Sequence, residues 1–122
     1  VILRGGKAPN YAKADVDAAC AQLKAAGLRE QVMIDCSHAN SSKQHQRQIV
    51  VAEDVAAQIA AGEARITGLM IESHLEEGRQ DIVDGQRLKP GVSVTDACIS
   101  FAQTQPVLQG LAEAVRARRA KG

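Results

Sequence analysis

Three short aliphatic segments recur along the chain at regular intervals. They are VILR at residues 1–4, QVMID at residues 31–35 and ITGLMIE at residues 66–72. None of them alternates strictly between apolar and polar positions, as a strand with one solvent-facing side does. Each is therefore typical of a parallel strand that is buried on both faces. The pattern predicts three strands of one parallel sheet.

A helical pattern follows each of the first two segments. The first predicted helix spans residues 14–26 and ends before Gly27, and the second spans residues 42–61 and ends before Gly62. Glycine is a common residue just past the end of a helix. The second helix carries an apolar stripe made of Ile49, Val50, Val55 and Ile59. The order strand, helix, strand, helix, strand implies right-handed crossovers and predicts an α/β fold.

The region after the third strand has a different character. Residues 77–91 are polar and rich in turn formers, and Asp84-Gly85 is the strongest hairpin signal in the chain. We therefore expect a long loop that holds a small β-hairpin. Two helices should follow, a short one over residues 95–101 and a longer one over residues 106–119.

Composition and charge narrow the class of protein. The 122 residues are 45% hydrophobic and 24% charged, which is typical of one globular domain over residues 1–122. The net charge of +1 provides no overall field that would attract nucleic acid or an acidic membrane surface. No apolar run approaches the roughly 20 residues that span a bilayer. Three widely spaced cysteines without a CxxC motif favour a reducing cytoplasm over a disulfide framework.

Charged and polar side chains stand at matching places in the three strands. Arg4, His38 and Glu72 each come at the end of an extended segment, and the two intervals between them are equal. Such an interval corresponds to one strand and its return helix. The three side chains should therefore lie side by side at the carboxyl ends of neighbouring strands, where parallel α/β folds bind ligands.

The residue types at this edge suggest a metal beside an anion. Imidazole and carboxylate, as in His38 and Glu72, suit divalent manganese, iron, cobalt or zinc. Asp96 could fold back from beyond the loop as a third ligand. Arg4 provides a permanently charged fork for a phosphate or carboxylate, and Gly5-Gly6 would let a ligand approach the backbone.

Each of these residues also has a structural interpretation. A histidine at a strand end is often held by hydrogen bonds alone, and Glu72 could pair with a surface arginine. Asp96 could stabilise the start of a helix capped by Thr95. Arg4 could belong to a structural ion pair. Their common spacing favours the shared site, because unrelated structural roles would not require it.

The neighbours of these residues leave further alternatives open. Cys36 should share a strand face with His38, so it is either another ligand or a small buried core residue. His74 stands in the same relation to Glu72. Asp35 should point to the opposite face, where it could orient a neighbouring side chain or cap a helix.

Four stretches resemble one known family. They are LRGGKAPNY, QVMIDCSHANSSKQ, GLMIESHLEEG and SVTDACISF. In this order and spacing they closely resemble the C-terminal portion of the type I 3-deoxy-arabino-heptulosonate 7-phosphate (DAHP) synthases, over practically the whole chain. The resemblance implies about three βα units of a (β/α)8 barrel.

The resemblance also implies a reaction and roles for particular residues. The family condenses phosphoenolpyruvate with erythrose 4-phosphate in the first step of the shikimate pathway, with release of phosphate. By position, His38, Glu72 and Asp96 match metal ligands, and Arg4 matches an arginine that binds phosphoenolpyruvate. His38 and Arg4 are thus the expected catalytic residues.

The resemblance also shows what this chain lacks. The family's fourth metal ligand is a cysteine that matches none of the three cysteines here. The chain begins inside a strand, so we expect the N-terminal strands of the barrel to be a missing partner. The alternatives are an inert structural or metal-binding fragment and a related octulosonate phosphate synthase. A cytoplasmic homo-oligomer is expected for the complete enzyme.

Overall fold

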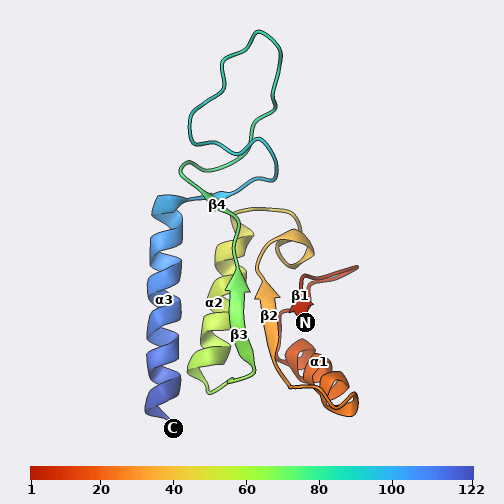
Figure 1. Cartoon of the computed structure of the whole chain (residues 1–122). Coiled ribbons are helices and arrows are strands. Elements are labelled where there is room, and N and C mark those ends of the chain that lie inside the picture. The colour runs from red at the N-terminus through yellow and green to blue at the C-terminus, as the bar shows by residue number, and fades with distance from the viewer.

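The computed structural model describes residues 1–122, and its first half has the predicted alternation of strands and helices (Figure 1). The elements, in chain order, are β1 (Ile2–Leu3), α1 (Lys13–Ala25), β2 (Val32–Asp35), the 3-10 helix η1 (His38–Ser41), α2 (Arg47–Ala60), β3 (Ile66–Met70), β4 (Ser73–His74), β5 (Ile99–Ser100) and α3 (Phe101–Ala120). The predicted α/β fold is therefore confirmed.

The three aliphatic segments form one parallel sheet in the order β1-β2-β3. In the central strand β2, Ile34 pairs with Leu3 of β1 on one side and with Leu69 of β3 on the other. All three strands run in the same direction, so their carboxyl ends meet at one edge of the sheet. The outer edges of β1 and β3 have no strand beside them.

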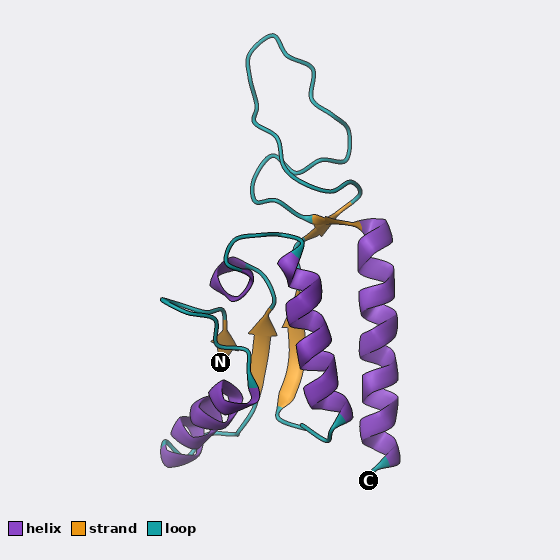
Figure 2. Cartoon of the chain, turned by 180° about the vertical axis from the view of Figure 1, so that it is seen from behind, coloured by secondary structure: helices purple, strands orange, loops and turns teal.

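Helices cover one face of this sheet. α1 and α2 lie against the strands, and α3 packs beside α2 (Figures 1 and 2). The prediction of a helix after each of the first two strands is confirmed, and α1 lies within one residue of its predicted bounds. None of the three α-helices combines the length and the apolar composition that crossing a lipid bilayer would need.

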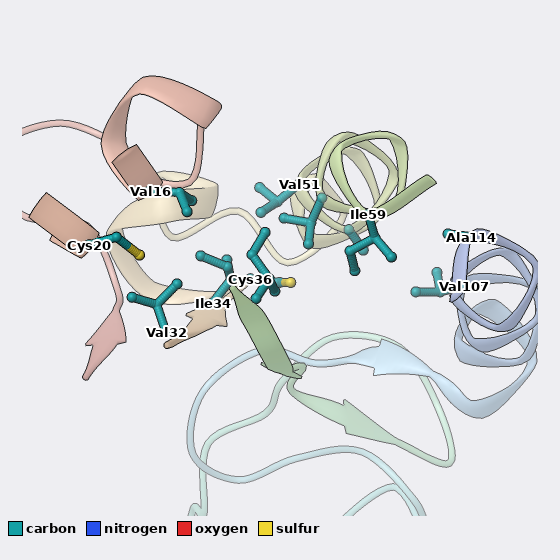
Figure 3. Packing of buried hydrophobic residues seen from close by; sticks show 12 residues of the cluster. Val16, Cys20, Val32, Ile34, Cys36, Val51, Ile59, Val107 and Ala114 are labelled. Carbon is teal, nitrogen blue, oxygen red and sulfur yellow. The ribbon is translucent and has the colours of Figure 1, made fainter. Parts of the chain in front are cut away.

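One hydrophobic cluster joins the helices to the sheet. Ile34 of β2 and Cys36 just beyond it are fully buried, together with Val16 of α1 and Val51 of α2, and Val107 of α3 closes the far side (Figure 3). Burying each aliphatic side chain of this size stabilises the fold by about 1.5–3 kcal/mol. This packing fixes β2 in place and thereby the position of the residues that follow its carboxyl end.

The second helix begins later than predicted. The expected start at Ser42 is wrong, because α2 begins at Arg47 after the 3-10 helix η1. Ser42 and Lys43 have positive φ angles of 54° and 58°, which lie outside the right-handed helical region, and His38 at the start of η1 has one of 49°. The backbone between β2 and α2 is therefore a tight, irregular turn, and it carries His38.

The two helices predicted near the C-terminus are also wrong. Residues 95–100 are not helical, since Ile99–Ser100 form β5, and one continuous helix then runs from Phe101 to Ala120. The Ser100 hydroxyl accepts a hydrogen bond from the Gln103 N–H, and the Gln103 side chain accepts one from the Ser100 N–H. This capping box begins the helix ahead of Pro106, which removes one backbone hydrogen bond without ending it.

The long loop contains no hairpin. A turn does form at Asp84-Gly85, but residues 80–92 contain no strand. The two sides of the loop are joined by the Gln80 side chain instead of by paired strands. Its amide donates to the carbonyls of Lys89 and Val92 and accepts from the Lys89 N–H. The polar sequence around the turn has no apolar face to bury, so paired strands gain little there. In Figure 1 this loop extends away from the sheet.

The base of the loop is closed by backbone contacts. Gly78 and Cys98 exchange two hydrogen bonds as an antiparallel bridge, and β4 pairs with β5 in a second small parallel sheet. The Ile99 N–H also donates to the Glu72 carbonyl, at 3.1 Å. These contacts return the chain to the carboxyl end of β3 and bring Asp96 beside residues that lie far from it in sequence.

Candidate metal centre

Three potential metal ligands converge at the carboxyl edge of the sheet. His38 Nε2 lies 3.3 Å from Glu72 Oε1 and 3.7 Å from Asp96 Oδ2. One donor atom from each residue lies within 4.8 Å of the other two. A ring nitrogen and two carboxylate oxygens at this separation could hold one divalent cation. The structure thus brings together the three residues that the sequence suggested as ligands.

The His38 ring is oriented by a buried carboxylate. Asp35 Oδ2 lies 2.8 Å from His38 Nδ1, and Asp35 Oδ1 accepts a hydrogen bond from the Ser37 N–H. Asp35 is 4% exposed, so its carboxylate is held in place by the surrounding protein. With Nδ1 engaged, Nε2 is the nitrogen that faces Glu72 and Asp96. A carboxylate behind a histidine ligand is a common support in metal sites.

The two carboxylates have different surroundings. Glu72 follows β3, and its side chain is 17% exposed. Asp96 stands in the long loop with a side chain that is 72% exposed. The hydrogen bonds near it hold the backbone: the Arg79 Nε–H donates to the Thr95 carbonyl, and the Cys98 thiol donates to the Asp96 carbonyl at 3.5 Å. Asp96 cannot be the start of a helix, because no helix begins there. The site therefore consists of two well-supported residues and one loop residue.

Arg4 lies beside this cluster without an ion-pair partner. It lines a cavity of about 400 Å³ together with His38, Lys43 and Asp96. It forms no salt bridge, so the structural ion pair considered above is not formed. An exposed, uncompensated guanidinium at this position is available to bind an anion.

Two asparagines tie the Arg4 loop to the His38 turn. The Gly5 N–H donates to the Asn10 side chain at 2.7 Å, and the Asn10 N–H donates to Asn40 Oδ1 at 2.7 Å. The fully buried Asn40 side chain donates in turn to the carbonyls of Leu3 and Asp35. Sequence reasoning missed these residues, since an asparagine in a loop gives no sign of which backbone groups it will reach.

Gly5 provides a test of the close packing between the Arg4 loop and Ala39. We expect Gly5→Ala in the complete protein to lower stability by about 2–4 kcal/mol, combining overpacking with a left-handed backbone. Gly5 has a φ of +80°, and an added Cβ would lie 2.7 Å from the Ala39 Cβ. Gly6→Ala is the matched control, because nothing lies within 4 Å of its added Cβ. Equal melting temperatures for the two variants would contradict the packing described.

Cys36 and His74 lie outside the cluster. Cys36 is fully buried in the core, and His74 is exposed with its Nδ1 accepting the Leu75 N–H. Neither belongs to the group of three ligand atoms. For Cys36 the structure therefore favours the core interpretation over ligation.

The buried thiol gives a second prediction. Burial, and secondarily the charge of Asp35, raise the pKa of Cys36 to about 12. At pH 8 only about one thiol in ten thousand would then be ionised. We expect Cys36 in the native protein to resist iodoacetamide at pH 8 and to react fully after unfolding, as read by peptide mass spectrometry. Rapid native labelling would show that this strand end opens readily.

The fold and the site define an α/β protein whose candidate ligand-binding groups stand at the carboxyl ends of parallel strands. Residues 1–109 match the DAHP synthetase I family, and the chain belongs to this family. It is 52% identical over 120 residues to the phospho-2-dehydro-3-deoxyheptonate aldolase of Haemophilus influenzae, covering 98% of this chain. It is 54% identical over 119 residues to the Phe-sensitive aldolase of Escherichia coli K12, again covering 98% of this chain.

A solved structure agrees with these relatives. The phospho-2-dehydro-3-deoxyheptonate aldolase from Francisella tularensis SCHU S4 superposes with a TM-score of 0.92 at 49% identity, covering 97% of this chain and 34% of that one. The chain spans about a third of the length of its curated relatives, 33% and 34% for the two proteins named.

Proposed function

We propose that this chain carries part of the active site of a phospho-2-dehydro-3-deoxyheptonate aldolase. The complete enzyme would condense phosphoenolpyruvate with erythrose 4-phosphate to give DAHP and phosphate, at the entry to the shikimate pathway. The observation that carries the proposal is the meeting of His38, Glu72 and Asp96 beside the unpaired Arg4. Family membership supports the same reaction.

The proposed setting of the site is a (β/α)8 barrel. We assign the chain to the C-terminal part of that barrel, as about three βα units. A three-stranded parallel sheet with helices on one face and no strand beyond β1 or β3 supports this assignment. In a closed barrel both edges would be paired by further strands. Cytoplasmic location and homo-oligomer formation remain predictions for the complete enzyme.

The donor set fits a divalent metal ion. His38, Glu72 and Asp96 would hold it, and Asp35 would keep the His38 ring turned so that Nε2 faces it. Manganese, iron, cobalt and zinc all accept nitrogen and carboxylate ligands. Such an ion supplies Lewis-acid polarisation of a carbonyl oxygen when bound, which is the activation that the aldehyde of erythrose 4-phosphate requires.

Arg4 would act on phosphoenolpyruvate. Its guanidinium would bind the phosphate or carboxylate of this substrate and hold it beside the metal ligands. In the reaction, the third carbon of phosphoenolpyruvate forms a bond to the aldehyde carbon. Water adds at the second carbon, and the C–O bond to phosphate breaks as the ketone forms. Arg4 would offset the anionic charge through these steps.

As an isolated polypeptide the chain should be inactive. The edges of β1 and β3 are unpaired, and Asp96 is largely exposed to water. A catalytic site of this kind needs its water-excluding walls and its remaining ligand and substrate residues. The alternative that the isolated chain is an inert structural or metal-binding fragment is thus compatible with the enzyme function of the complete protein.

The proposed reaction has a direct test. The complete protein, loaded with Mn²⁺, should release phosphate from phosphoenolpyruvate in the presence of erythrose 4-phosphate. Arabinose 5-phosphate, the substrate of an octulosonate phosphate synthase, should support at most a small fraction of this rate. A preference for arabinose 5-phosphate would favour the second enzyme, and no release with either sugar would contradict both.

A further inference from the structure

A buried glutamine of α2 forms hydrogen bonds with the backbone of one proposed metal ligand. Gln48 is 1% exposed, and its side-chain amide lies against the peptide groups of Glu72. Gln48 Nε2 donates to the Glu72 carbonyl at 3.1 Å, and Gln48 Oε1 accepts from the Glu72 N–H at 2.8 Å. We propose that Gln48 is a positioning residue that fixes Glu72 for metal binding.

The position of Glu72 explains why such a contact is needed. Glu72 lies beyond β3, whose last residue, Met70, pairs with Asp35 of β2. The parallel ladder with β2 therefore does not hold Glu72. Its backbone is instead held by Gln48 from α2 and by the Ile99 N–H from β5. Fixing the peptide on both sides limits the directions in which the carboxylate can point.

Gln48 and Asp35 hold the two less exposed ligands in a similar way. Each is almost fully buried, and each contacts one ligand residue: Asp35 the ring of His38, and Gln48 the backbone of Glu72. The Asp96 side chain has no comparable buried support, because its surroundings are the exposed loop. His38 and Glu72 thus form a preorganised pair, and Asp96 completes the site from the loop.

The same helix contains a matched control. Gln58 also uses its side-chain amide to donate to a backbone carbonyl, that of Tyr11, at 2.8 Å. It stands nearly three helical turns from Gln48, about 15 Å along the axis, and contacts no proposed ligand. A general effect of losing a glutamine side chain from α2 should therefore also appear in Gln58 variants.

The test is a Co²⁺ titration of the complete protein, followed by the visible absorption of the bound ion. Gln48→Met keeps the side-chain volume and removes both hydrogen bonds, so we expect the affinity to fall about tenfold to a hundredfold and the spectrum to change. Gln58→Met should stay within about twofold of the unsubstituted protein. Gln48→Glu keeps an acceptor for the Glu72 N–H but places a second oxygen where Nε2 donated to the Glu72 carbonyl, so its affinity should also fall.

The outcomes separate this inference from the proposed function on which it rests. If the unsubstituted protein binds no Co²⁺, the proposed metal site itself is wrong. If it binds and a folded Gln48→Met binds equally well with the same spectrum, only the role of Gln48 is overturned. Equal losses in Gln48→Met and Gln58→Met would also overturn it. Where Gln48→Met does not fold, unchanged affinity in Gln48→Glu decides against the proposal.

Discussion

Replacing His38 by alanine in the complete protein should remove metal binding and nearly all activity. His38 is the residue that contacts both carboxylates of the site, so its loss leaves two acidic groups without the nitrogen ligand between them. Lewis-acid stabilisation is worth several kcal/mol, and each 1.36 kcal/mol is a factor of ten in rate. We expect activity to fall by at least about a thousandfold and bound metal, measured by elemental analysis, to fall to background.

His74→Ala is the control for this experiment. His74 follows Glu72 closely in sequence but lies outside the group of ligand atoms and uses its Nδ1 on the Leu75 N–H. Metal content and activity should therefore remain near those of the unsubstituted protein. Full metal content in His38→Ala would show that the ion binds elsewhere.

Replacing Arg4 by alanine should weaken substrate use without loss of metal. Truncating one partner of a desolvated charge pair costs about 2–5 kcal/mol, so we expect kcat/KM for phosphoenolpyruvate to fall by about thirtyfold to five-thousandfold. Arg4→Lys should recover only part of this loss, because an ammonium keeps the charge but not the planar fork. Steady-state kinetics and metal analysis on the same samples measure both effects.

Arg29→Ala is the corresponding control. Arg29 is an exposed arginine that forms no salt bridge, and it precedes β2, at the opposite end of the strand from the site. Its removal changes the net charge by the same amount as Arg4→Ala. Equal losses in the two variants would show a general charge effect rather than a contact between Arg4 and the substrate.

The sequence was sufficient to predict the sheet and the residues at its edge. Short aliphatic runs indicate parallel strands, and equal intervals between strand ends place Arg4, His38 and Glu72 at neighbouring positions. The structure confirms the parallel sheet and brings His38 and Glu72 together. The spacing alone gave weaker support to Asp96 as a metal ligand, because the position of Asp96 depends on how the long loop folds back to the sheet. The resemblance to DAHP synthases supplied that assignment.

Other features could not be read from the sequence because tertiary contacts decide them. Pro106 indicated a helix start, yet the capping box at Ser100 and the packing of α3 on α2 outweigh one lost hydrogen bond. Ser42 and Lys43 were expected to begin the second helix, but both adopt positive φ. Gln48 looks like any polar residue of an amphipathic helix. Only the path of the chain beyond β3 shows that Gln48 contacts the backbone of Glu72.

The most direct test of the metal centre is anomalous X-ray diffraction from crystals of the complete protein soaked in Mn²⁺. We expect one strong peak within coordination distance of His38 Nε2 and of carboxylate oxygens from Glu72 and Asp96, close to Arg4. A strong peak at other residues, or no peak at a fully formed cluster, would contradict it.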